Sequence, residues 1–287
     1  MQSIFRDSLF ADQTIVVSGG GTGIGRAVAR ELAALGAHVV ICSRSVEHLE
    51  PTCAEIAATG GAVTAIACNI RDPDAVATFF RQVREEIGPV HGLVNNAGGQ
   101  FLSPAELITP KGWHAVVETN LTGTWYMSRA ALDVGLRESG GAIVNVVMEM
   151  WRGFPGMAHS GAARAGVVNL TQTLALEWAP YAVRVNAVAP GLINSSGLTR
   201  YPPEVQAGLA GIAAEVPAQR MGTEAEIAAA VIFLLSPAAA FISGTTLKVD
   251  GAGSLYRLQG YTIPEHAPWP AWDTLSASED EQLADEE

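Results

Sequence analysis

Short apolar runs recur along the first 250 residues and are separated by longer segments with helical periodicity. The runs contain four to six residues, with apolar side chains at mostly consecutive positions, which is typical of parallel strands buried on both faces. They occupy residues 14–18, 38–42, 63–67, 91–95, 142–147, 183–188 and 246–249. The pattern therefore predicts a sheet of seven parallel strands.

The intervening segments have the composition and periodicity of helices. They occupy residues 23–35, 46–58, 74–87, 112–137, 159–180 and 224–235. Strands that alternate with helices at this spacing predict an α/β fold, a single-domain Rossmann-like doubly wound sheet of seven parallel strands flanked by helices.

The alternation indicates one domain over residues 10–253, followed by a C-terminal extension over residues 254–287. Residues 192–221 interrupt the alternation and contain three prolines, so they are a candidate active-site lid. The extension is rich in aromatic residues and proline, and six of its last nine residues are acidic. We expect the extension to pack on its own or a neighbouring subunit and to end in a solvated acidic tail.

Charge and cysteine content exclude several classes of protein. The chain carries 17 basic and 29 acidic side chains, a formal net charge of −12, so binding of nucleic acid through phosphate neutralisation is not expected. No apolar run is long enough to cross a membrane. The spacing of the histidines and of Cys42, Cys53 and Cys68 fits neither a metal site nor a disulfide framework. These features favour reduced thiols and a cytoplasmic location.

A glycine-rich segment, Ser-Gly-Gly-Gly-Thr-Gly-Ile-Gly, lies between the first predicted strand and the first predicted helix. Its candidate cofactor-binding residues are Gly19, Thr22, Gly23, Ile24 and Gly25. Glycine permits a tight turn and close approach of a pyrophosphate, and the helix N-terminus offers backbone N–H groups to the anion. Glycines also make ordinary turns, but their place after the first strand predicts dinucleotide binding.

The second predicted strand is followed by Ser43 and Arg44 rather than by an acidic residue. An NAD site usually places a carboxylate there to accept a hydrogen bond from the ribose 2′-hydroxyl, whereas a guanidinium suits a 2′-phosphate. We therefore predict NADP(H) as the cofactor. The alternative is that Arg44 is an ordinary exposed residue.

Several motifs resemble those of the classical short-chain dehydrogenase/reductases over residues 10–253. They are the glycine-rich segment, Asn-Asn-Ala-Gly at 95–98, Thr-Asn-Leu-Thr-Gly at 119–123 and Arg-Val-Asn-Ala-Val-Ala-Pro-Gly at 184–191. The resemblance implies that the remaining cofactor-binding residues are Asn69, Ile70, Asn96, Ala97, Gly98, Arg164, Pro190, Gly191 and Ile193. It also implies a homotetramer built on the helices at 112–137 and 159–180.

Longer runs are similar to the peroxisomal trans-2-enoyl-CoA reductase branch of that family. They include Gly-Gly-Gln-Phe-Leu-Ser-Pro-Ala-Glu at 98–106 and His-Ser-Gly-Ala-Ala-Arg-Ala-Gly-Val at 159–167. The resemblance extends past the last strand, into residues 254–256 and 263–270. Gln100 and Phe101 are candidates to border an acyl pocket.

The resemblance exposes an altered active site. The family uses Asn, Ser, Tyr and Lys, and these positions fall at Asn120, Val147–Met148, Ser160 and Arg164. A serine hydroxyl is far less acidic than a phenol of pKa about 10, and an arginine does not shuttle protons. Ordinary reduction of a ketone through a tyrosine is therefore not expected.

Conjugate reduction of an enoyl thioester needs hydrogen-bond donors at the developing enolate oxygen rather than full proton transfer. Ser160, Asn120 or a cofactor ribose hydroxyl could donate, and water or a nearby acid could protonate Cα. Glu149 is a candidate acid if its apolar neighbours raise its pKa; alternatively it is a solvated loop carboxylate.

The sequence thus predicts an NADP(H)-dependent reductase of trans-2-enoyl-CoA thioesters. The alternatives are a dehydrogenase of acyclic terpenoid or other hydrophobic alcohols and aldehydes, and a catalytically depleted NADP(H)-binding sensor. The expected partner is an acyl-CoA or hydrophobic carbonyl substrate. Arg152, Arg200 and Arg220 are candidates to bind coenzyme A phosphates.

Overall fold

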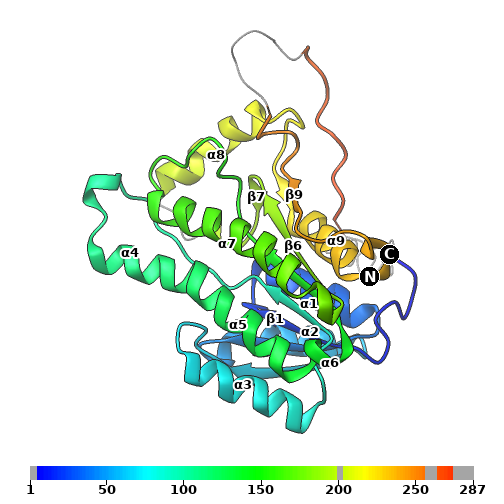
Figure 1. The fold of residues 1–287 in the computed structure, drawn as a ribbon. Coiled ribbons are helices and arrows are strands. Elements are labelled where there is room, and N and C mark those ends of the chain that lie inside the picture. Colours follow the sequence, from blue (N-terminus) through cyan, green and yellow to red (C-terminus); the bar gives the residue numbers. More distant parts are fainter. Residues whose placement is uncertain (1–4, 199–202, 256–263, 274–287) are drawn as a thin grey trace, which may run out of the picture.

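A computed structural model describes residues 5–198, 203–255 and 264–273. Seven parallel strands form one sheet in the order β3-β2-β1-β4-β5-β6-β9 (Figure 1). Their bounds are β1 Thr14–Ser18, β2 His38–Ser43, β3 Ala62–Ala67, β4 Gly92–Asn95, β5 Gly141–Val146, β6 Val183–Pro190 and β9 Thr246–Val249. The expected doubly wound α/β fold is confirmed.

Helices cover both faces of the sheet (Figure 1). Their bounds are α1 Gly23–Ala34, α2 Glu50–Ala58, α3 Pro73–Glu86, α4 Pro110–Val117, α5 Gly123–Ala131, α6 Arg137–Ser139, α7 Ala158–Glu177, α8 Pro203–Glu215 and α9 Glu224–Leu235. The first predicted turn of the second helix is instead a separate 3₁₀ turn at Val46–His48, and α2 begins with Pro51 in its first turn.

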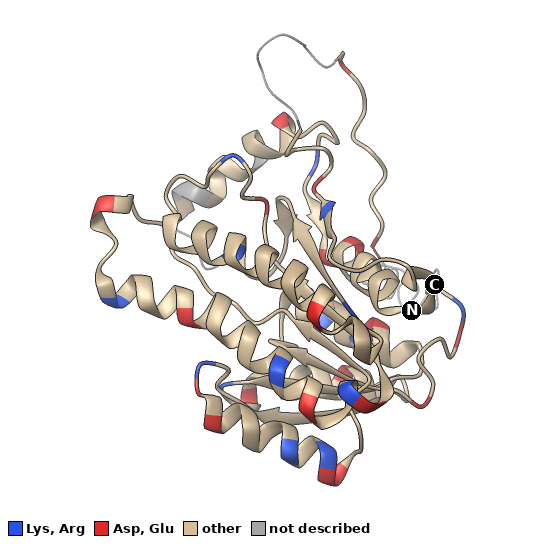
Figure 2. Ribbon diagram, viewed as in Figure 1, with Lys and Arg blue, Asp and Glu red and all other residues tan. Residues whose placement is uncertain are grey.

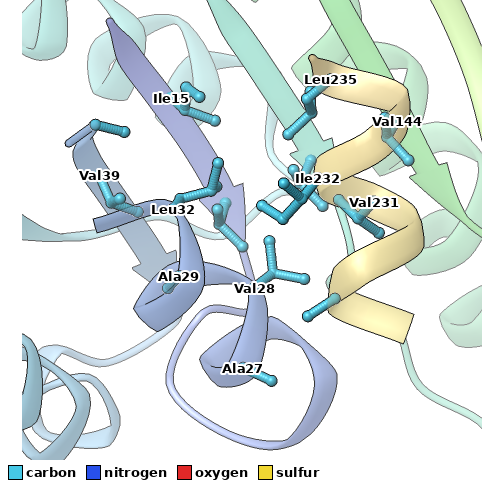
Figure 3. Close-up of a cluster of buried hydrophobic side chains, with 14 of the residues drawn as sticks. Ile15, Ala27, Val28, Ala29, Leu32, Val39, Val144, Val231, Ile232 and Leu235 are labelled. Atoms are coloured by element: carbon cyan, nitrogen blue, oxygen red, sulfur yellow. The ribbon is translucent and has the colours of Figure 1, made fainter. Parts of the chain in front are cut away.

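Alternate side chains of the central strands point into two separate hydrophobic cores. Ile15 packs with α1 and α9 on one face, as Figure 3 shows around Val28 and Ile232. Val16, the next residue of β1, packs on the opposite face with residues of α3, α5 and α7. Burial on both faces explains why the strands read as continuous apolar runs.

The single helix expected over residues 112–137 is a longer helical rod with two π-turns. The π-turns, η3 Glu118–Thr122 and η4 Leu132–Leu136, separate α4, α5 and α6. Each π-turn inserts an extra residue into the helix, and such insertions are frequent at functional sites. The first one contains Asn120.

The segment expected to be a lid has regular structure in the described part. Strand β7 (Ile193–Asn194) pairs with β8 (Gly222–Thr223), and α8 lies between them. Residues 199–202, including Arg200, lie outside the described residues, as does the acidic tail from residue 274 onward. Residues 264–273 extend over their own chain, where the Trp269 N–H donates to the Ala218 carbonyl at 3.1 Å.

Residues of opposite charge occur near one another along the outer helices, most visibly on α3, α5 and α6 (Figure 2). Arg137 and Asp133 are 3.1 Å apart, and Arg84 approaches Glu138 at 3.9 Å. Such exposed pairs contribute little to stability. None of the described helices is long and apolar enough to cross a membrane.

Candidate active site

The glycine-rich loop between β1 and α1 is held in a cradle shape. Gly19 and Gly23 have φ angles of 68° and 60°, a left-handed conformation that favours glycine. A Cβ atom on Gly25 would lie 2.2 Å from the Gly19 carbonyl oxygen, so that position excludes a side chain. The amide of Asn96 donates to the carbonyls of Ser18 and Gly19, both at 3.1 Å. These contacts fix the loop.

The N-terminus of α1 opens onto this cradle. Thr22 is the N-cap residue, but its side chain makes no capping hydrogen bond, and the first turn of α1 contains no acidic residue. The first backbone N–H groups therefore keep their hydrogen-bonding capacity for an anion, and the helix dipole favours negative charge there. Cradle and helix end together fit a dinucleotide pyrophosphate.

The adenosine side of the predicted site lies at the carboxyl ends of β2 and β3. Arg44 follows β2 with an exposed side chain and makes no ion pair with any described residue. Its neighbour Ser43 donates to the Ser45 carbonyl. Asn69 is exposed beyond β3, with Oδ1 accepting from the Arg71 N–H at 3.3 Å, whereas Ile70 is buried against Gly123. These residues lie at the carboxyl-terminal end of the sheet, as does the glycine-rich loop.

The side chain of Asn120 is fully buried in the first π-turn and pairs with the backbone N–H and C=O of one residue, Gly99. Its Nδ2 donates to the Gly99 carbonyl at 2.8 Å, and its Oδ1 accepts from the Gly99 N–H at 3.0 Å. The side-chain amide thus uses one donor and one acceptor to bind the backbone of Gly99, the residue after Ala97 and Gly98. Asn120 fixes the chain segment that leads to Gln100.

Arg164 is buried on α7 beneath the same segment. Its Nη1 donates to the Val146 carbonyl at 2.8 Å, and desolvation lowers the pKa of its guanidinium to about 10. The group remains protonated at neutral pH. A Cβ atom on Gly98 would lie 2.2 Å from its Nη2, so the guanidinium occupies the space that the absent side chain leaves.

Ser160 lies one helical turn before Arg164 and is also fully buried. Its hydroxyl donates to Oε1 of Gln100 at 2.8 Å and lies 3.5 Å from the sulfur of Met148. The side chain of Gln100 is exposed and carries the Nε2 amide group, which has two N–H donors. Asn120, Gln100, Ser160 and Arg164 thus come together, as expected for a single site.

His159 packs beside this group without facing it. Its Nδ1 accepts the backbone N–H of Ser160 at 2.8 Å, and its ring meets Phe101 edge-on at 4.3 Å between centroids. In the neutral ring the proton therefore sits on Nε2, which is buried and has no hydrogen-bond partner among the described residues.

Glu149 lies in the loop after β5, and its backbone N–H donates to the Pro190 carbonyl at 3.2 Å. Its Oε1 is buried without a hydrogen-bond partner among the described residues, so the carboxyl group is not simply solvated. Pro190 ends β6, and Gly191 packs against Asp250 where a side chain would not fit. Ile193 is buried in β7 beside Gly222.

Two of the three arginines considered for coenzyme A are engaged within the protein. Arg152 donates to the Ser254 carbonyl. Arg220 forms a 2.6 Å ion pair with Glu226 and also donates to the backbone carbonyls of residues 221, 269 and 270. This arrangement does not support binding of coenzyme A phosphates by Arg152 or by Arg220. Among the described residues, no cluster of His, Cys, Asp and Glu could hold a metal ion.

The sequence predicts Gln100 only as a residue that borders the acyl pocket. The structure places Gln100 in direct contact with the residue at the usual tyrosine position. The run Gly-Gly-Gln-Phe after the Asn-Asn-Ala-Gly motif was the available signal. Exposed Phe101, Leu102 and Trp151 add apolar surface from the neighbouring loops.

The chain is similar to known proteins over most of its length. A family model described as enoyl-(acyl carrier protein) reductase matches residues 19–253. A probable 2,4-dienoyl-CoA reductase of Bacillus subtilis is 38% identical over 83% of this chain and 95% of its own length. The peroxisomal 2,4-dienoyl-CoA reductase of Rattus norvegicus is 36% identical over 86% of each chain.

A solved structure described as a citronellol catabolism dehydrogenase of Pseudomonas aeruginosa is 49% identical. It covers 88% of this chain and 100% of that one, with a TM-score of 0.80. The family match covers most of the chain and includes the glycine-rich loop and the altered tetrad positions. The chain therefore belongs to the short-chain dehydrogenase/reductase family of nicotinamide-dependent oxidoreductases.

Proposed function

We propose that this protein is an NADP(H)-dependent reductase of the 2,3 double bond of trans-2-enoyl-CoA thioesters. The observation that carries the proposal is the pairing of Ser160 with Gln100 at the usual tyrosine position. This pair supplies hydrogen-bond donors but no phenolic acid, which suits an enolate better than an alkoxide.

A bound NADPH would supply the hydride that reaches Cβ of the enoyl thioester. As that bond forms, the π electrons move toward the thioester oxygen, where the Nε2 group of Gln100 donates a hydrogen bond. Ser160 orients the amide through Oε1, and Asn120 fixes the backbone of the preceding residue, Gly99. Water or Glu149 then returns a proton to Cα.

Arg164 contributes charge rather than proton transfer. Its guanidinium is protonated at neutral pH and lies one helical turn from Ser160, so it favours a negatively charged oxygen nearby. We propose that it also binds the nicotinamide ribose hydroxyls. The hydrogen bond to the Val146 carbonyl uses only one of its five N–H donors.

The preference for NADP(H) is proposed from Arg44. Its exposed side chain follows β2, where the adenosine ribose binds in dinucleotide-binding folds, and no described residue neutralises its charge. Gly19, Thr22, Gly23, Ile24 and Gly25 are proposed to hold the pyrophosphate. Ser43, Asn69, Ile70, Asn96, Ala97, Gly98, Pro190, Gly191 and Ile193 are proposed to complete the cofactor site.

A second candidate function follows from the solved structure with 49% identity, which is described as a citronellol catabolism dehydrogenase. The exposed apolar side chains of Phe101, Leu102 and Trp151 suit a branched hydrocarbon chain as well as an acyl chain. Oxidation of an alcohol would require a group that takes the hydroxyl proton, and the candidate for that role is the carboxyl group of half-buried Glu149, whose Oε1 is buried.

The test is to follow NADPH oxidation at 340 nm with crotonyl-CoA, a longer trans-2-enoyl-CoA, a 2,4-dienoyl-CoA, citronellal and a simple ketone. Turnover of enoyl-CoA supports the proposal. Turnover of the dienoyl-CoA alone would indicate that the substrate is a 2,4-dienoyl-CoA, as the names of the two dienoyl-CoA reductases state for those relatives. Turnover of citronellal alone would favour the second candidate. Tight NADPH binding without any turnover would favour a sensor.

We also propose a homotetramer that assembles through α5 and α7, where Trp125 and Leu176 are 40% and 79% exposed. A cytoplasmic location is proposed because the three cysteines are free thiols. Residues 10–253 are proposed as the catalytic domain, and residues 254–287 as an extension that docks on it.

A further inference from the structure

Residues 264–273, here called the C-terminal strap, cross the surface as extended chain without helix or strand. The strap descends from the top of the molecule toward α9 in Figure 1. It is mostly exposed. A cavity of about 300 Å³ lies beside Trp269 and is lined by residues from the segments 192–193, 216–226 and 248–252. The strap is held mainly by hydrogen bonds between its backbone groups and side chains of the protein body.

Arg220 is the main anchor of the strap. Its Nε donates to the Trp269 carbonyl at 2.8 Å, and its Nη2 donates to the Pro270 carbonyl at 2.9 Å. Its other three N–H groups bind the Met221 carbonyl and both carboxylate oxygens of Glu226. All five donors of the guanidinium are thus used in one arrangement that a lysine cannot reproduce.

Glu226 and Thr223 complete the attachment. Oε1 of Glu226 accepts the backbone N–H of Trp272 at 3.3 Å, and the Thr223 hydroxyl donates to the Trp272 carbonyl. The same two residues form the capping box of α9. The strap is therefore fastened to residues 222–224, where β8 leads directly into α9; this junction is here called the β8–α9 turn.

That turn also contacts the proposed cofactor site. β8 pairs with β7, and the Gly222 N–H donates to the Leu192 carbonyl at 2.9 Å. Glu224, the first residue of α9, accepts the Ser196 N–H at 3.2 Å. Its carboxylate lies 3.5 Å from where a Cβ atom on Gly23 would be, so it faces the glycine-rich loop directly.

The end of the strap approaches the same carboxylate. Burial raises the pKa of Glu224, and the negative charge of Asp273 raises it further, whereas the Ser196 N–H and Arg26 act in the opposite direction. Asp273 and Arg26 thus lie close enough to Glu224 for their charges to act on its carboxyl group.

We infer that the C-terminal strap is a retaining element of the dinucleotide site, and that Arg220 is its positioning residue. By fastening the β8–α9 turn, the strap holds residues 192–198 against the glycine-rich loop and slows release of the dinucleotide. The inference rests on the proposed function only in requiring that a nicotinamide dinucleotide binds that loop; it does not depend on the substrate.

The test compares NADPH release, by stopped-flow fluorescence with displacement by excess NADP⁺, from three forms of the protein. The full chain and a chain ending at Asp273 keep the strap, and a chain ending at Ile263 lacks it. We expect release about tenfold faster from the shortest chain, which corresponds to the loss of one or two net hydrogen bonds. The chain ending at Asp273 should match the full chain.

Arg220→Lys keeps the charge opposite Glu226 and provides a variant of full length. It should release NADPH about as fast as the shortest chain, and its Trp269 and Trp272 amides should exchange hydrogen faster than in the wild type. Release within twofold of wild type in both variants would overturn the inference while leaving the proposed function intact. Absence of NADPH and NADH binding to the full chain would overturn both.

Discussion

The hydroxyl of Ser160 lies 2.8 Å from Oε1 of Gln100, at the place where the family carries a catalytic tyrosine. A serine is too short to extend where a phenol would, but it reaches an amide on the neighbouring loop. We propose that Nε2 of this amide donates a hydrogen bond to the substrate where the phenol would have donated. A positioned hydrogen-bond donor would then take the place of the missing acid.

The first prediction concerns Gln100. Gln100→Ala should lower kcat for enoyl-CoA about 100-fold with a small change in KM, because the donated hydrogen bond strengthens in the transition state. Ser160→Ala should lower kcat less, about tenfold, because the amide remains but loses its orientation. Gln82→Ala, on α3, serves as the control. Equal kcat for Gln100→Ala and wild type would contradict the assignment.

The second prediction uses two adjacent glycines. A Cβ atom on Gly98 would meet the buried guanidinium of Arg164 at 2.2 Å, whereas one on Gly99 would meet nothing within 4 Å. Gly98→Ala should therefore destabilise the protein by about 1–3 kcal/mol, and Gly99→Ala should be close to neutral. Urea denaturation measures both.

The steric clash between an alanine at position 98 and the guanidinium of Arg164 should depend on the size of residue 164. Because a lysine is less bulky than a guanidinium at its end, Arg164→Lys should restore part of the stability lost in Gly98→Ala. Strict additivity of the two free-energy changes would show that the two residues do not interact.

The third prediction concerns cofactor choice. Arg44→Ala should raise the Kd for NADPH about tenfold or more and leave the Kd for NADH nearly unchanged, because only the 2′-phosphate loses a charge-assisted hydrogen bond. Isothermal titration with both cofactors measures the ratio, with Arg81→Ala on α3 as the control. A parallel loss of affinity for both cofactors would argue against a 2′-phosphate contact.

The fourth prediction is a pH dependence that arises from Glu224. Burial raises the pKa of its carboxyl group in the folded protein, so its contribution to stability is present at low pH and is lost as pH rises through the folded pKa. Glu224→Gln keeps an oxygen for the Ser196 N–H but removes the charge. The variant should gain stability over wild type between pH 4 and pH 7.

The same substitution should strengthen NADPH binding at pH 7, because it removes a negative charge that faces the pyrophosphate loop. Thermal unfolding across this pH range and a binding titration provide the two readings. A stability difference that does not change with pH would show that the Glu224 carboxyl titrates alike in both states.

The fifth prediction tests the proposed assembly. Leu176→Glu, on the exposed face of α7, should dissociate the tetramer, because an interface of this kind does not accept an unpaired charge. Ile212→Glu introduces the same change on α8, which is outside the proposed interface, and should leave the mass unchanged. Light scattering after size-exclusion chromatography distinguishes the two outcomes; a wild-type monomer would contradict the assembly.

Much of the fold could be predicted because the central strands are buried on both faces. Val16 and Val17 of β1 point into opposite cores, and both positions must be apolar. The π-turn at Asn120 could not be predicted, because the hydrogen bonds that stabilise it come from Gly99, 21 residues away.

The positions of the candidate site residues could be predicted from motifs, whereas the contacts between their side chains could not. Motif positions identified Ser160 and Arg164, but the contact between Ser160 and Gln100 depends on how a loop after β4 meets α7. Arg220 looked like a free cation in the sequence, yet its donors are all used by Glu226 and by backbone carbonyls, two of them from the strap. Long-range contacts of backbone groups leave no pattern in the chain.

The most direct test of the account is to locate the transferred hydride. Crotonyl-CoA is incubated with the protein and NADPH that carries deuterium at the transferable nicotinamide C4 position, and the product is analysed by NMR and mass spectrometry. The account predicts butyryl-CoA with one deuterium on Cβ. Deuterium at the carbonyl carbon, or no deuterated product while citronellal is reduced under the same conditions, would contradict it.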